Sequence, residues 1–257
     1  MRINTNVGAL TASRNIFVNQ LATEGSMRKL SSGLRISRAA DDAAGLAIAN
    51  KLRTQSRSLN QAASNAEQGN AMLNIAEGAA STIQRIIERQ KELITQKLNG
   101  TSSDSTSTTI EAEITTLSGE VSRIIGSTTF QGTSVFASLV FQVSDTSANG
   151  TVTVGASLAV ADVSLSGTAS LSDADDAMDA INSVLANIGA GQNVLDYTLT
   201  NLKSSVVNVR AAESTIRDVD MAEEMANFTK NNILSQAAQA MMSQANQGSQ
   251  GVLSLLR

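Results

Sequence analysis

One unbroken helical seam constrains this chain more than any other feature. Residues along it recur in alternating steps of three and four: Leu59, Ala62, Ala66, Gly69, Leu73, Ala76, Ala80, Ile83, Ile87, Gln90 and Ile94. This spacing places all of them on one face of an α-helix, in the a/d pattern of a coiled coil. The chain has no proline, the commonest helix breaker. A helix over residues 59–98 would be about 60 Å long, which predicts a rod.

Two further seams predict two further helices. The second seam consists of Ile110, Ile114, Leu117, Val121 and Ile124, and the third of Met178, Ile181, Leu185, Ile188, Gln192, Leu195, Leu199, Leu202, Val206 and Val209. Thr108 and Glu111 have the spacing of a capping box before the second seam. The acidic run "SDADD" (172–176) suits the positive end of the third helix. Because one chain must return on itself, we expect the two longest helices to be antiparallel.

The period changes between the second and third seams. "LVFQV" (139–143) and the Val- and Thr-rich start of residues 151–167 indicate a β-hairpin or small meander within about 137–168. The predicted fold is therefore mainly α: a long antiparallel coiled-coil helical rod with a small β insert, and with the N- and C-terminal helices paired.

Both ends of the chain are amphipathic. The N-terminal segment has a weaker seam, interrupted by Arg14, whose apolar residues are Ile3, Val7, Leu10, Phe17 and Leu21. The C-terminal stripe runs through Leu234, Ala238, Met241, Ala245, Gly248, Val252 and Leu255. Two paired helices cover only one side of each other. The remaining apolar surface would be a liability in a monomer, so we expect other molecules to bury it.

Composition excludes several kinds of function. The absence of histidine excludes Ser-His-Asp and Cys-His catalysis and histidine-bearing zinc sites. The net charge of −4 gives no electrostatic case for nucleic acid, and no stretch is apolar enough to span a membrane. The N-terminus lacks the pattern of a conventional secretory signal. We expect no enzyme, no cofactor and no metal.

Two acidic clusters have simpler explanations than chemistry. Asp41 and Asp42 precede a helix expected to begin near Ala43, and helix capping needs neither a cleft nor a raised pKa. Asp173, Asp175, Asp176 and Asp179 lack the glycine and the distal glutamate of a calcium loop. Gly33 in "LSSGL" is placed as a helix C-cap.

Several stretches together resemble bacterial flagellin. They are the opening "MRINTN", "KLSSGLRISRAADDAAGLAIANKLR" (29–53), "IERQKELITQ" (87–96), "STTFQGTSV" (127–135) and "AAESTIRDVDMAEEMANFTKNNILSQAAQAMMSQANQ" (211–247). The resemblance covers roughly residues 1–136 and 172–257, in the order that the family requires.

The resemblance implies a minimal flagellin without large variable outer domains. It implies an inner filament-core domain of residues 1–41 and 219–257, an outer rod domain of residues 42–218, and assembly into the extracellular helical filament used for swimming. Implied partners are further copies of the chain, an export chaperone of the flagellar type III apparatus, the filament cap and the hook–filament junction proteins. The expected filament-core residues are Val7, Leu10, Phe17, Leu21, Phe228, Ile233, Leu234, Met241, Val252 and Leu255.

Arg89, Leu93 and Glu113 match a flagellin surface that a vertebrate Toll-like receptor reads. Family filaments turn this surface toward a neighbouring subunit, so the resemblance implies a subunit contact and makes recognition as an innate immune receptor ligand a consequence. Two alternatives stay open from the sequence. One is a hook–filament junction protein, and the other is a soluble signalling coiled coil.

Overall fold

The protein divides into two compact units. The computed structural model describes residues 6–99, 103–145 and 150–255. For residues 249–255 it describes the helical backbone, together with the exposure of Gly251 alone. Residues 1–54 and 209–257 form one unit, here called the terminal unit, and residues 55–208 form the other, the central unit. The domain boundaries expected from the sequence, 1–41 with 219–257 and 42–218, stay a prediction.

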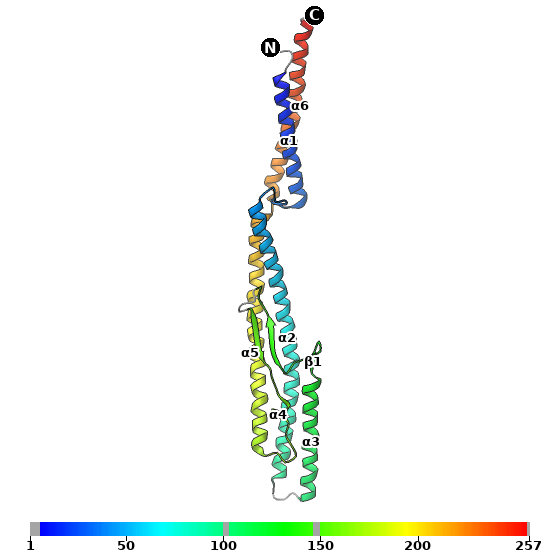
Figure 1. The fold of residues 1–257 in the computed structure, drawn as a ribbon, viewed down its shortest axis with the longest axis vertical. Coiled ribbons are helices and arrows are strands. Elements are labelled where there is room, and N and C mark those ends of the chain that lie inside the picture. Colours follow the sequence, from blue (N-terminus) through cyan, green and yellow to red (C-terminus); the bar gives the residue numbers. More distant parts are fainter. Residues whose placement is uncertain (1–5, 100–102, 146–149, 256–257) are drawn as a thin grey trace. The chain divides into compact units, whose positions relative to one another are not determined.

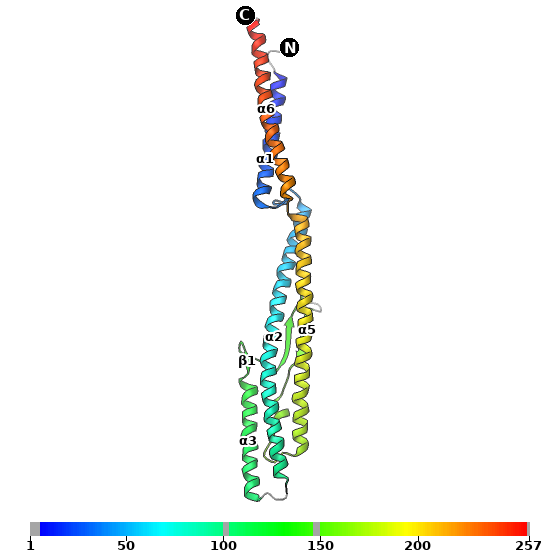
Figure 2. The same ribbon diagram turned by 180° about the vertical axis from the view of Figure 1, so that it is seen from behind.

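The terminal unit is an antiparallel helix pair. Helices α1 (Val7–Ser32) and α6 (Met221–Leu255) lie side by side (Figures 1 and 2). Near one end of the pair, the Asn6 side-chain amide donates to the Ala245 carbonyl at 2.9 Å. Near the other end, Lys29 Nζ lies 3.6 Å from a carboxylate oxygen of Glu224. The predicted pairing of the two terminal helices is therefore confirmed.

The chain leaves α1 through a left-handed glycine. Gly33 has φ 70°, and its N–H donates to the Lys29 carbonyl, as the sequence predicts for a C-cap. An isolated antiparallel bridge then joins Leu34 to Asp218. Backbone hydrogen bonds on both sides of the bridge, from Arg35 N–H to the Arg217 carbonyl and from Val219 N–H to the Gly33 carbonyl, fix the two connecting segments to each other.

Three helices form the frame of the central unit. The long helices α2 (Ala43–Lys97) and α5 (Leu171–Arg217) run antiparallel within it, and α3 (Asp104–Ser127) lies beside α2 (Figures 1 and 2). Cross-helix contacts give the register of α2 against α5: Glu67 with Lys203 at 3.2 Å, Asn70 with Asp196 at 2.7 Å, and Asn74 with Gln192 at 3.0 Å. The antiparallel prediction is confirmed.

The seam predicted on α2 is the core of this unit. All its members from Leu59 to Ile94 are buried. On α5 the buried residues are Ala174, Ala177, Ile181, Val184, Ile188, Gly191, Leu195, Leu202 and Val206. Burial is thus shifted by one position from the predicted Met178, Leu185 and Gln192 to Ala177, Val184 and Gly191. On α3, burial is likewise shifted by one position, from Leu117 to Ser118 and from Ile124 to Ile125.

The β insert is smaller than predicted. Strands β3 (Ser138–Gln142) and β4 (Thr151–Gly155) form the expected antiparallel hairpin, with Leu139 opposite Val154. The chain then leaves β geometry and makes a short helix, α4 (Val160–Val163), so the β region does not continue toward residue 168. The turn-like "SANG" (147–150) lies mostly outside the described residues.

The structure contains a second hairpin that the sequence pattern does not predict. Strands β1 (Thr129–Phe130) and β2 (Thr133–Ser134) pair antiparallel. Gln131 and Gly132 connect them with φ values of 50° and 81°, the positive pair that a tight two-residue hairpin turn requires. Two-residue strands are too short to show an alternating pattern, so periodicity does not predict this hairpin.

Each of the five longest helices in the described part of the chain begins with a capping side chain. The acceptors are Asn6 for α1, Asp42 for α2, Ser103 for α3, Ser170 for α5 and Asp220 for α6. The capping box predicted at Thr108 and Glu111 is wrong, because α3 already begins at Asp104 and Thr108 donates to the Asp104 carbonyl inside it. A reciprocal box instead joins Ser170 and Asp173 at the start of α5.

Candidate assembly surfaces

The apolar stripe predicted on α1 does not face α6. The residues that α6 shields are mostly small or polar: Ala9, Ala12, Ile16, Asn19, Thr23 and Ser26. With about 3.6 residues per turn, the stripe lies on the opposite side of the helix. Val7, Leu10, Phe17 and Leu21 are accordingly 52–67% exposed. The helix pair therefore leaves this stripe uncovered.

Helix α6 shows the same division. Its shielded residues recur in steps of four and three: Glu224, Phe228, Asn231, Ser235, Ala238, Met242 and Ala245. Ile233, Leu234 and Met241 are exposed by 43–64%. Phe228 differs from the other expected filament-core residues because it is half-buried in the helix pair. The side chains of Val252 and Leu255 lie outside the described residues.

The exposed apolar surface is larger than the sequence suggested. Val18 and Met27 on α1, and Met221 and Met225 on α6, are 48–55% exposed. The sequence pattern missed them because they fall outside the single stripe on each helix. An apolar groove of about 430 Å³ also runs along the pair, and Val7, Thr11, Ala12, Ala238 and Met241 are among its lining residues.

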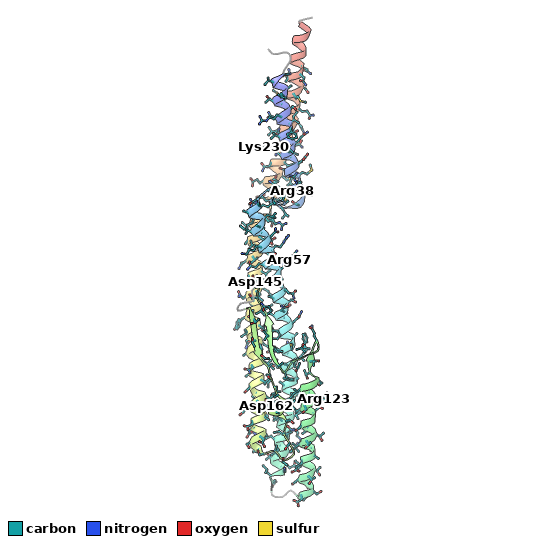
Figure 3. The ribbon with its side chains drawn as sticks, in the orientation of Figure 1. Arg38, Arg57, Arg123, Asp145, Asp162 and Lys230 are labelled. Atoms are coloured by element: carbon teal, nitrogen blue, oxygen red, sulfur yellow. The ribbon has the colours of Figure 1, made fainter. Side chains whose placement is uncertain are left out.

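Charged side chains also occur in the terminal unit. Arg38, in the loop after α1, and Lys230, on α6, are exposed and labelled in Figure 3. Glu224, only 8% exposed, lies at the shielded seam of the pair and meets Lys29 there. An exposed apolar surface of this kind is typical of a protein–protein interaction site.

The acidic pair before α2 is structural. One oxygen of Asp41 accepts hydrogen bonds from the backbone N–H groups of Arg38 and Ser37 and from the Ser37 hydroxyl. These bonds, that from Arg38 first, hold the pKa of Asp41 below its usual value. A general acid needs a raised pKa, so this shift is opposite to the catalytic requirement. Asp42 accepts the N–H of Gly45 at 2.9 Å, which confirms the capping prediction for Asp42, whereas Asp41 stabilises the turn that precedes the helix.

A second polar surface joins α2 and α3. The Arg89 guanidinium lies 3.0 Å from Glu92 and 3.3 Å from Glu113, and hydrogen bonds to these two carboxylates, Glu92 first, raise the pKa of Arg89. Leu93 is only 2% exposed. Of the three residues singled out from the sequence, the structure brings Arg89 and Glu113 together at the surface and places Leu93 in the core.

The described residues contain no group of three or more acidic side chains placed to hold a metal ion. At the start of α5, Asp173 instead accepts from the Ser170 N–H and hydroxyl, which lowers the pKa of Asp173. Within the same described ranges, no helix combines the length and apolar character needed to cross a bilayer.

A helix pair with uncovered apolar faces on both members, in a chain built mainly of long helices, defines a structural subunit of a larger assembly. Residues 3–140 match the family model of the bacterial flagellin N-terminal helical region, and residues 171–256 match that of the C-terminal helical region. The chain belongs to the bacterial flagellin family.

Full-length relatives agree. The chain is 39% identical to a flagellin of Bacillus subtilis (strain 168), 41% identical to a flagellin of Halalkalibacterium halodurans, and 39% identical to the flagellar filament 33 kDa core protein of Treponema phagedenis. In each comparison, all of this chain and all of the relative are covered. This chain is a non-enzymatic subunit of the extracellular flagellar filament, and it has no large variable domain between α3 and α5.

Proposed function

We propose that this flagellin polymerises through the exposed apolar faces of α1 and α6, with other copies of the chain as the occupant. The main support for this proposal is the exposed apolar surface on the side of α1 that faces away from α6, made by Val7, Leu10, Phe17 and Leu21. Each fully buried side chain of this kind contributes about 1.5–3 kcal/mol. Repeated contacts between unlike surfaces do not close on themselves and generate helical polymers.

The groove along the helix pair supports the same proposal. It is open, apolar and bordered by Val7 and Met241, which both belong to the expected filament-core set. An apolar side chain of a neighbouring copy fits its character. The shielded seam between α1 and α6 is small and polar, so it offers little apolar surface to stabilise the pair, whereas packing against further copies would cover the outer faces.

The Arg89–Glu113 surface is a second proposed contact with a neighbouring copy. Support comes from its exposure and from the residue-by-residue resemblance to the family surface. Recognition by a vertebrate Toll-like receptor would use the same exposed side chains. Leu93 would contribute by holding the helix surface in place, since it is buried.

Further partners are proposed for α6. Its exposed Ile233, Leu234 and Met241 form the kind of amphipathic helix face that a groove on an export chaperone can bind. The filament cap and the hook–filament junction proteins would meet the same terminal surfaces at the two ends of the polymer. Export through the flagellar type III apparatus belongs to this proposal.

Electron microscopy of seeded assembly tests the main proposal. We would compare the full chain, a truncation lacking residues 234–257, and the triple variant Leu10→Gln, Phe17→Gln and Leu21→Gln. Glutamine keeps helix propensity high, so circular dichroism should show unchanged helix content. We expect long helical filaments from the full chain and none from the truncation or the triple variant.

A matched control tests whether the loss of any large exposed side chain would prevent assembly. Tyr197 on α5 of the central unit is 80% exposed, and Tyr197→Gln should assemble normally. Normal filaments from the triple variant would show that the stripe is not an assembly surface. A discrete small oligomer of the full chain at every concentration would instead favour a soluble coiled coil.

A further inference from the structure

Four exposed methionines of this protein lie on the two helices proposed for assembly. The chain has eight methionines and no cysteine, histidine or tryptophan. Four methionines of the terminal unit, Met27, Met221, Met225 and Met241, are 48–64% exposed. In the central unit, Met72 is 6% exposed and Met178 is half-buried.

We propose that these four methionines are oxidation sites through which a peroxide switches assembly off. The thioether sulfur attacks one peroxide oxygen, the O–O bond breaks, and the sulfur gains that oxygen as a sulfoxide while the peroxide is reduced to water. The sulfur loses two electrons and the peroxide gains them. The product is polar and chiral, and methionine sulfoxide reductases can reverse it.

Because of where these four residues lie, oxidation impairs assembly and leaves the folded helix pair intact. All four are exposed, whereas Met242 is the half-buried methionine of the α1–α6 seam. Oxidation of the exposed four therefore leaves the helix pair intact. It places polar sulfoxides where another copy must pack, and burying one polar group without a partner reduces affinity by about tenfold or more. This inference rests on the proposed function, because it requires these faces to be buried in the polymer.

The first experiment uses the full-length subunit, treated with hydrogen peroxide or mock-treated. Seeded elongation is followed by turbidity and electron microscopy, and oxidation is mapped by peptide mass spectrometry. We expect Met27, Met221, Met225 and Met241 to oxidise before Met72, elongation to fall at least about tenfold, and helix content to stay unchanged. Treatment with methionine sulfoxide reductases should restore elongation.

Two variants give the matched comparison. Leucine has nearly the volume of methionine and cannot be oxidised, so the fourfold Met→Leu variant at positions 27, 221, 225 and 241 should elongate after peroxide as it does before. The double variant Met72→Leu and Met178→Leu should remain as sensitive as the wild type. Loss of elongation in the oxidised fourfold variant, or normal elongation of the oxidised wild type, would overturn the proposal.

A measurement on the wild type keeps the test independent of variant folding. After partial oxidation and seeding, the soluble fraction should be enriched in sulfoxide at the four positions and the filaments depleted of it. Equal sulfoxide content in both fractions would refute the switch. If the mock-treated wild type fails to elongate, the proposed function itself is wrong, so the two failures are distinguishable.

Discussion

At the residue scale, one buried amide connects three segments of the central unit. The Gln90 side-chain N–H₂ donates to the Ile114 carbonyl at 3.1 Å and to the Ser118 hydroxyl at 2.9 Å, and that hydroxyl donates to the Leu165 carbonyl. Gln90 is fully buried, and its side-chain oxygen accepts no hydrogen bond from the described residues. Gln90 thereby joins α2, α3 and the segment after α4.

Gln90→Ala should lower the free energy of unfolding by about 2–4 kcal/mol, because it leaves a cavity and unpairs buried polar groups. Gln90→Met retains most of the volume and should cost less. Urea titration followed by circular dichroism would measure both. Equal stability of Gln90→Ala and the wild type would show that the three segments do not depend on this amide.

Asp41 gives a pH dependence with a defined sign. Its folded-state pKa is lowered from 3.8 by backbone hydrogen bonds from Arg38 and then Ser37, so the unfolded chain takes up the proton more readily. The stabilisation is present above the unfolded pKa and is lost as the pH falls through the folded one. Asp41→Asn should therefore melt below the wild type at neutral pH, and the difference should shrink toward about pH 3. A difference that grows in acid would contradict this assignment.

At the element scale, the β3–β4 hairpin depends on a glycine in α5. A Cβ at Gly191 would lie 2.6 Å from Cγ2 of Val154 on β4, closer than van der Waals contact allows. The side chain of Val154 is buried. The hairpin therefore approaches α5 at a position where only glycine leaves room.

Gly191→Ala should destabilise the central unit by about 1–3 kcal/mol through overpacking, despite the better helix propensity of alanine. Gly189→Ala is the matched control, because a Cβ there has no neighbour within 4 Å and should stabilise by up to about 1 kcal/mol. Adding Val154→Ala should recover part of the Gly191→Ala loss in a double-mutant cycle. Additive losses in that cycle would show that the two residues do not interact.

At the scale of the whole molecule, the two units have unequal cores. Among the described residues, the buried hydrophobic side chains of the terminal unit are Ala12, Ile36 and Ala49, and all the others belong to the central unit. The terminal unit has little buried apolar surface to offset the entropy of ordering two long helices. Its stability must therefore be the lower of the two.

Hydrogen exchange on the free subunit should show this difference. We expect amides of α1 and α6 to exchange much faster than those of α2 between residues 59 and 94, because local opening follows the weaker core. In assembled filaments, the same terminal amides should become protected. Strong protection of residues 7–32 and 221–248 in the free subunit would contradict a terminal unit that is completed by assembly.

The long helices, their antiparallel return, the β3–β4 hairpin and the family could all be predicted from the order of the residues. A seam from Leu59 to Ile94 is buried in full because a 3.6-residue period leaves no other way to collect these side chains on one face. Five stretches of residues carried the resemblance to flagellin. Local rules predict less well where several capping residues compete: the sequence pattern favours Thr108, whereas Ser103 caps α3.

Which helix face packs against which partner could be read from the folded chain alone. Periodicity shows that a face requires burial, and it does not show what buries it. Hence the stripe of Val7, Leu10, Phe17 and Leu21 lies away from α6, while small and polar residues form the pair. Leu93 is a core residue for the same reason. Other segments pack against that side of α2 and cover it, and no local pattern encodes this packing.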